Sequence, residues 1–169
     1  MEQVILFIED EEALTPYVIL ARAENKFPGW QIIVKDRIDD TIKWCEQQEA
    51  NDKKLIFVVD SRMTTDILPE YLEKALTNEK TVREQVSDFI SDDRFTGALG
   101  TIVLKKLMPG CKTILISAFY RTINEARRRH ATLDKTLRKS IDVELPKIGG
   151  PEEGLTQAIS SQITSSWNL

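Results

Sequence analysis

The sequence has little of what marks secreted, membrane-spanning or zinc-binding proteins. Its 169 residues include two cysteines, one histidine and no apolar run close to the roughly 20 residues that a membrane-spanning helix needs. Cys45 and Cys111 belong to no CxxC motif, so we expect two buried, reduced thiols rather than a disulfide or a metal site. The beginning of the chain, Met1 to Val4, lacks the basic and apolar segments of a secretory signal, so we expect a cytoplasmic protein.

An excess of positive charge is also missing. The formal net charge is −4, with 41% hydrophobic and 30% charged residues, a balance typical of a globular protein that has no attraction for nucleic acid or for anionic membranes. One local cluster departs from this balance. It comprises Arg127, Arg128, Arg129 and His130, followed by Lys135, Arg138 and Lys139. We interpret the cluster as a solvated helix face, with docking of an acidic partner as the functional alternative; no interleaved aromatic residues favour direct nucleic-acid binding.

Short apolar runs predict the strands of a buried sheet. The runs cover 4–8, 31–34, 55–59 and 113–116, with a weaker candidate at 141–145. Their β-branched content and lack of polar alternation are typical of a parallel sheet covered on both faces. Helical patterns lie between them, at 12–26, 97–107, 122–130 and 152–163. A further helix is expected to follow the second strand, with Asp39 or Asp40 as its N-terminal cap. The alternation predicts one α/β domain over residues 1–169, a doubly wound five-stranded parallel sheet.

Residues 64–96 interrupt this alternation. The segment is much longer than an ordinary loop between a strand and a helix. Leu68, Leu72 and Leu76 share helical spacing, and Val82, Val86, Phe89 and Ile90 do so further on. We therefore expect an inserted helical hairpin, with its apolar positions packed on the domain itself.

Acidic side chains follow two of the predicted strands. Glu9 and Asp10 come directly after the first strand, and Asp60 comes directly after the third. Because the carboxyl ends of parallel strands meet at one edge of a sheet, the three carboxylates should converge there. Their mutual repulsion would be relieved by a hard divalent cation, and oxygen ligands suit Mg²⁺. Ser117 and Lys147, after the fourth and fifth strands, would bring a hydroxyl and an ammonium to the same edge.

These residues resemble a bacterial response-regulator receiver domain. The resemblance rests on 5–11 (Ile-Leu-Phe-Ile-Glu-Asp-Glu), 58–63 (Val-Val-Asp-Ser-Arg-Met), 116–118 (Ile-Ser-Ala) and 145–147 (Leu-Pro-Lys). It implies a flavodoxin-like receiver fold, in which Asp60 is the phosphoacceptor and helps Glu9 and Asp10 hold Mg²⁺. It also implies that Ser117 is the switch hydroxyl and that Lys147 contacts the phosphate.

The function that this resemblance implies is that of a single-domain response regulator. Its phosphoryl donor would be a sensor histidine kinase or a phosphotransfer protein, and its output would be contact with a protein target that the sequence does not identify. Turnover chemistry beyond self-phosphorylation and slow autodephosphorylation is not expected, nor is direct binding to nucleic acid or a membrane. A homodimer is left open. Large residues, Arg62 and Phe119, follow Asp60 and Ser117 by two positions, which in the family influences the lifetime of the acyl phosphate.

Some positions depart from the family pattern and leave alternatives. Glu144 stands where the family usually has an aromatic switch residue, and Lys147 is preceded rather than followed by proline. The separation of Lys147 from Ser117 is long, so Lys139 is a rival for the site lysine. These departures support a second hypothesis, a phosphorylation-independent pseudo-receiver that acts as a protein-binding module. A third, an aspartate-nucleophile phosphohydrolase, is weakened because Arg62 replaces the second aspartate of that motif.

Overall fold

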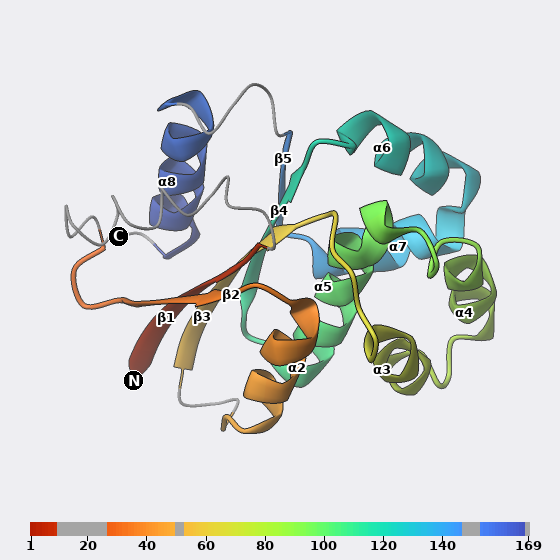
Figure 1. Cartoon of the computed structure of the whole chain (residues 1–169), viewed down its shortest axis with the longest axis horizontal. Helices are drawn as coiled ribbons and strands as arrows, with labels where there is room; N and C mark the ends of the chain where they lie inside the picture. Colours follow the sequence, from red (N-terminus) through yellow and green to blue (C-terminus); the bar gives the residue numbers. More distant parts are fainter. Residues whose placement is uncertain (10–26, 50–52, 147–152, 168–169) are drawn as a thin grey trace.

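A parallel sheet forms the centre of the molecule. The computed structural model describes residues 1–9, 27–49, 53–146 and 153–167, with side chains from 157 to 165 in the last segment. The five strands are β1 (Glu2–Ile8), β2 (Gln31–Lys35), β3 (Lys53–Asp60), β4 (Lys112–Ser117) and β5 (Val143–Pro146). Their order is β2-β1-β3-β4-β5, and every neighbouring pair is parallel. The predicted doubly wound α/β fold is therefore confirmed, with β3 in the middle of the sheet (Figure 1).

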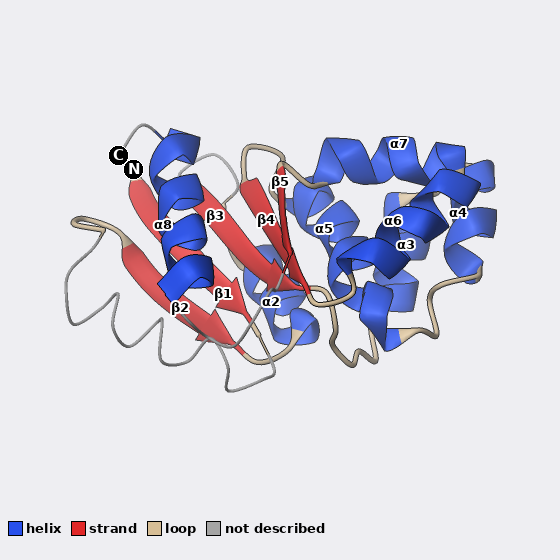
Figure 2. Ribbon diagram, turned by 90° about the horizontal axis from the view of Figure 1, so that it is seen from above, coloured by secondary structure: helices blue, strands red, loops and turns tan. Residues whose placement is uncertain are grey.

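Both faces of the central strands are buried, which explains why their sequences lack polar alternation. In β3, Phe57 and Val59 belong to the cluster on one face, whereas Ile56 and Val58 belong to the cluster on the other. Helix α8 (Glu153–Trp167) covers this second face with Ile159 and other side chains, whereas α2 (Ile38–Glu46) and α5 (Thr96–Leu107) cover the first (Figure 2). A sheet covered on both sides leaves only its strand ends accessible to a ligand.

The predicted insertion is a pair of helices. Helix α3 (Leu68–Ala75) and helix α4 (Lys80–Ser87) are followed by a 3₁₀ turn, η2 (Asp93–Phe95), that leads directly into α5. Leu68, Leu72 and Leu76 lie in the same apolar cluster as Val82 and Val86, packed with α5. The helical hairpin expected at 64–96 is confirmed, and its apolar positions are satisfied within the domain.

Two helices rather than one connect β4 to β5. They are α6 (Tyr120–Arg129) and α7 (Ala131–Ser140), separated at His130, whose φ of −131° and ψ of 71° interrupt helical geometry. Helix α7 was not predicted. Leu133 and Leu137 are its buried apolar residues and pack into the cluster shared with α4 and α5. Together with the insertion, these helices extend the helical layer beyond β4 and β5 (Figure 2).

The prediction that Asp39 or Asp40 caps a helix is wrong, because both residues lie within the first turn of α2. Helix α2 begins at Ile38, and its N-cap position, Arg37, makes no side-chain capping bond. The Asp39 carboxylate instead accepts hydrogen bonds from the Asp66 backbone N–H (2.9 Å) and from the Thr65 hydroxyl. Asp39 thus anchors the first residues of the insertion to α2. The helix expected at 12–26 lies outside the described residues.

The two cysteines are buried and free, as predicted. Burial raises the pKa of both thiols, Cys45 and Cys111, to about 12, so neither is a ready nucleophile or metal ligand at neutral pH. Within the described part of the chain, no helix is both long and apolar enough to cross a lipid bilayer.

Candidate functional site at the carboxyl edge of the sheet

Glu9, Asp60 and Ser117 lie at the carboxyl ends of three adjacent strands. Ile8 of β1 pairs with Val59 of β3, so Glu9 and Asp60 follow at the same level of the sheet. Asp60 in turn pairs with Ile116 of β4, which places Ser117 one step beyond it. Glu9, Asp60 and Ser117 are 6%, 2% and 2% exposed. The sheet register thus brings together the two carboxylates and the hydroxyl that the sequence placed at this edge.

A pair of hydroxyl groups joins the carboxyl ends of β3 and β4. The hydroxyl of Ser61, next to Asp60, donates a 2.7 Å hydrogen bond to the hydroxyl oxygen of Ser117. The same Ser117 oxygen accepts the backbone N–H of Phe119 at 2.9 Å. The backbone N–H of Ser61 is bound to the Ile116 carbonyl at 2.9 Å. Ser117 therefore orients both the residue that follows Asp60 and the loop that leads into α6.

The last residues of the insertion pack directly on the loop that follows Asp60. The Gly97 N–H donates to the Ser61 carbonyl at 2.8 Å, and the Met63 N–H donates to the Asp93 carbonyl at 3.1 Å. A Cβ at Gly97 would lie 1.9 Å from the Asp60 carbonyl oxygen, so only glycine permits this approach. Met63, the last residue of the stretch 58–63 on which the resemblance rests, is buried.

An aromatic ring with two arginines lies beside the strand ends; we call Arg62, Phe119 and Arg94 the rim stack. The guanidinium carbons of Arg62 and Arg94 are 5.7 and 5.9 Å from the centre of the Phe119 ring, within the range of cation–π attraction. Arg62 also pairs with Asp93 at 3.2 Å, and Arg94 pairs with Asp92 at 2.6 Å. Both arginine side chains are about half exposed, and Arg94 comes from the inserted segment.

The other predicted site residues, Asp10 and Lys147, lie outside the described residues. The rival lysine, Lys139, lies at the wrong end of β4. Its neighbour Ser140 accepts a 2.5 Å hydrogen bond through its carbonyl from Thr113, near the start of that strand, whereas Ser117 ends it. Among the described residues, no group of three or more His, Cys, Asp or Glu side chains is arranged to hold a metal ion.

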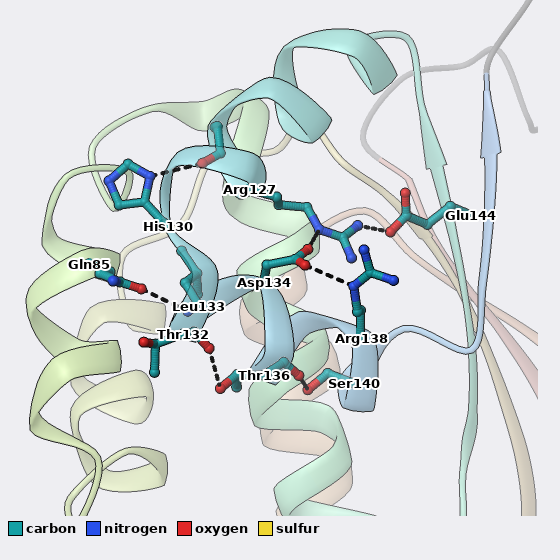
Figure 3. A network of polar contacts seen from close by, with 11 residues as sticks. Gln85, Arg127, His130, Thr132, Leu133, Asp134, Thr136, Arg138, Ser140 and Glu144 are labelled. Atoms are coloured by element: carbon teal, nitrogen blue, oxygen red, sulfur yellow. Dashed lines mark hydrogen bonds and ion pairs between the residues drawn. The ribbon is translucent and has the colours of Figure 1, made fainter.

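A buried arginine pairs with Glu144, the residue at which the resemblance leads us to expect an aromatic side chain. Arg127 of α6 has a side chain only 9% exposed, and it pairs with Glu144 of β5 and with Asp134 of α7, the latter at 2.6 Å (Figure 3). Asp134 also accepts a 2.8 Å bond from Arg138. We call Arg127, Asp134, Arg138 and Glu144 the Arg127 network. It borders a cavity of about 430 Å³, lined also by Tyr120 and Asn124.

The charges of the Arg127 network are mutually stabilising. Burial alone would raise the pKa of Asp134, but hydrogen bonds from Arg138 and Arg127 outweigh it, so this pKa lies below its ordinary value. The interpretation of the basic cluster as a solvated face is correct for the exposed Arg128 and Arg129 and wrong for Arg127. The acidic residue Glu144, out of place in the family pattern, was the available signal for a buried partner.

Comparison with solved structures agrees with the fold. The response regulator domain of Thermotoga maritima CheB superposes with a TM-score of 0.52, covering 98% of this chain and 93% of that one at 10% identity. A response regulator from Thermotoga maritima gives 0.52, covering 97% and 99% at 8% identity. The chain has the receiver fold. At these identities the likeness establishes the fold alone, and no protein-family model or curated protein matches the sequence.

Proposed function

We propose that this chain is a single-domain response regulator that accepts a phosphoryl group on Asp60 and signals by contact with a protein target. The observation that carries the proposal is the position of Asp60. It ends the central strand of a receiver fold, at the level of Glu9 and beside Ser117. In doubly wound sheets, ligands bind in the crevice beyond the carboxyl ends of the strands. The phosphoryl donor would be a histidine kinase or a phosphotransfer protein.

The residues at this edge fit a magnesium ion. Glu9 and Asp60 are two buried carboxylates from adjacent strands, and oxygen donors of this kind suit a hard divalent cation. With Asp10 as the third ligand, these residues would hold Mg²⁺. The bound ion would offset negative charge on the transferring phosphoryl oxygens.

The chain's own residues supply the acceptor and its surroundings. A carboxylate oxygen of Asp60 forms a bond to the phosphorus of the donor, and the bond between phosphorus and the donor's nitrogen or oxygen breaks, with its electron pair leaving on that atom. Lys147 would offset charge on the phosphoryl oxygens. The Ser117 hydroxyl, which already orients Ser61 and Phe119, would donate its proton as a hydrogen bond to the new group.

Intact-mass spectrometry after incubation with acetyl phosphate and Mg²⁺ tests the proposal. Wild type is expected to gain one phosphoryl adduct and Asp60→Asn to gain none. The control Asp66→Asn, which removes an exposed carboxylate at the far end of the same loop, is expected to gain the adduct. Glu9→Gln is expected to weaken Mg²⁺ binding, measured by calorimetry without any phosphodonor. If wild type remains unlabelled under conditions that label a known receiver domain, the proposal is wrong.

One observation favours a second function, a pseudo-receiver that binds proteins regardless of phosphorylation. The Arg127 network fixes β5 to α6 and α7 at the position where the family has a movable aromatic residue. A fixed surface there suits constant binding. If beryllofluoride with Mg²⁺ leaves the amide NMR spectrum of the whole chain unchanged, this second function is favoured over phosphorylation.

A further inference from the structure

We infer that the rim stack transmits the state of Asp60 to the inserted helices α3 and α4, so that the insertion rather than β5 presents the signal. The inference rests on the proposed function, because it requires a phosphoryl group on Asp60. It assigns Phe119 and Arg94 a role that neither the acceptor nor the metal ligands fulfil.

The first step runs from Asp60 to Phe119 through Ser117. The Ser117 oxygen accepts hydrogen bonds from both the Ser61 hydroxyl and the Phe119 N–H, at 2.7 and 2.9 Å. A phosphoryl group adds a charge of about −1.5 to −2 and three strong acceptor oxygens at this edge. When the Ser117 hydroxyl turns toward it, the Phe119 backbone must follow or lose its acceptor.

The second step runs from Phe119 to the insertion through the arginines. Arg94 and Arg62 both lie over the Phe119 ring, so a displacement of the ring changes the surroundings of both guanidinium groups. Arg62 is 52% exposed and held by one carboxylate, Asp93, at 3.2 Å. New negative charge two residues away competes with Asp93 for this cation, and ion pairs that water screens in this way exchange partners at little cost.

The third step runs from η2 into the helical hairpin. Asp93 is bound to the acceptor loop through its carbonyl as well as its carboxylate, and Phe95 packs on Phe89, which follows α4, with ring centres 4.7 Å apart. Phe89 in turn contacts the ring of His130 between α6 and α7 at 4.8 Å. A shift of η2 therefore reaches α4 through a continuous set of packed rings.

The insertion is also fixed at its far side, which limits how it can respond. Gln85 of α4 accepts the backbone N–H of Leu133 at 2.7 Å, at the beginning of α7. Asp39 holds Thr65 and Asp66 at the other end of the segment. With both of these anchors in place, movement of η2 alters the packing of α3 and α4 rather than releasing the hairpin from the domain.

Hydrogen–deuterium exchange of the full chain, with and without acetyl phosphate and Mg²⁺, tests the inference, with intact mass read in parallel. In wild type we expect labelling of Asp60 to change exchange in peptides covering 68–87. Phe119→Leu, which keeps apolar bulk without the ring, and Arg94→Gln are expected to become labelled but to lose that change. The matched controls Tyr120→Leu and Arg138→Gln should retain it.

The outcomes separate the inference from the function on which it rests. A labelled wild type with unchanged exchange at 68–87, or a change that persists in both Phe119→Leu and Arg94→Gln, overturns the inference and leaves the phosphoacceptor intact. Because Arg94 is exposed, its variant keeps the test open if Phe119→Leu does not fold. Absence of any adduct on wild type overturns the proposed function and the inference with it.

Discussion

The rim stack and the Arg127 network are two arginine clusters at opposite ends of helix α6. Phe119 directly precedes this helix, Arg127 lies in its last turn, and the two clusters differ in burial. In the rim stack, each arginine is about half exposed and pairs with one neighbouring carboxylate. In the Arg127 network, one buried arginine is shared by Asp134 and Glu144, which are themselves only 21% and 19% exposed. Water screens both arginines of the first cluster, whereas in the second it has little access to Arg127, whose side chain is 9% exposed.

The difference shows which cluster can exchange partners. An exposed ion pair contributes at most about 1 kcal/mol, whereas removing one member of a buried pair costs roughly 3–5 kcal/mol. A phosphoryl group at the sheet edge can compete for Arg62 but gains little by disturbing Arg127. The Arg127 network is therefore a fixed structural element, and the groups that can exchange partners are those of the rim stack.

The largest expected effect is that of removing the buried arginine. Arg127→Met should lower the free energy of unfolding by about 3 kcal/mol, because Asp134 and Glu144 lose their shared cation in a partly dry site. Arg138→Met is the matched control, since Arg138 shares Asp134 but is 74% exposed, and its loss of stability should be much the smaller of the two. Urea denaturation measures both; equal losses would contradict the distinction between the clusters.

The next effect concerns the backbone beneath the rim stack. Gly97→Ala should destabilise the chain by about 2 kcal/mol or more, because the new methyl group would overlap the Asp60 carbonyl oxygen at 1.9 Å. Gly110→Ala, where a Cβ meets nothing within 4 Å, is the control and should be nearly neutral. We also expect Gly97→Ala to reduce phosphoryl labelling of Asp60. If Gly97→Ala is as stable as wild type and fully labelled, the backbone of this region adapts as readily as its side chains, and the prediction is wrong.

A smaller effect follows from the lowered pKa of Asp134. A carboxyl group whose pKa is lower in the folded state stabilises the fold above its unfolded value of about 3.9, and this contribution is lost as pH falls through the folded pKa. Asp134→Asn should therefore flatten the dependence of unfolding free energy on pH below about 4. Denaturant titrations across that range measure the slope, and a slope equal to that of wild type would refute the assignment.

The smallest effect belongs to the rim stack itself. Arg94→Gln should change the free energy of unfolding least, since the Arg94 side chain is 41% exposed and water weakens both its pair with Asp92 and its contact with Phe119. The change should shrink further in high salt, which screens such pairs. Urea denaturation at low and high salt provides the measurement. A loss comparable to that of Arg127→Met would mean that the rim stack is structural rather than adaptable.

The sequence was sufficient for the sheet and for the part of the site that depends on strand ends. Each strand is a local apolar run, so the placement of Asp60 and Ser117 at one edge follows from the residue pattern alone. The burial of Arg127 was not predicted, because its signal, the acidic residue Glu144, is 17 residues away and its neighbours in the chain are exposed arginines. Helix α7 was missed because only Leu133 and Leu137 carry its apolar periodicity.

The contact between Arg94 and Phe119 was equally inaccessible from the sequence. It depends on how η2 is seated against the acceptor loop, and that seating is set by backbone bonds of Gly97 and Met63 which no residue pattern encodes. The predicted positions of Asp10 and Lys147 remain predictions of the strand-end argument, because these residues lie outside the described part of the chain.

The inserted hairpin also bears on how the chain folds. Ser61 and Ser117, whose hydroxyls join the ends of β3 and β4, are 56 residues apart in the chain. The insertion accounts for much of that connection. Closing a loop costs entropy that grows only with the logarithm of its length, so doubling a connection costs about 0.6 kcal/mol. Burying a single leucine side chain stabilises by about 1.5–3 kcal/mol. Burial of Leu68, Leu72 and Leu76 therefore more than offsets the added entropy cost of closing the longer connection between β3 and β4.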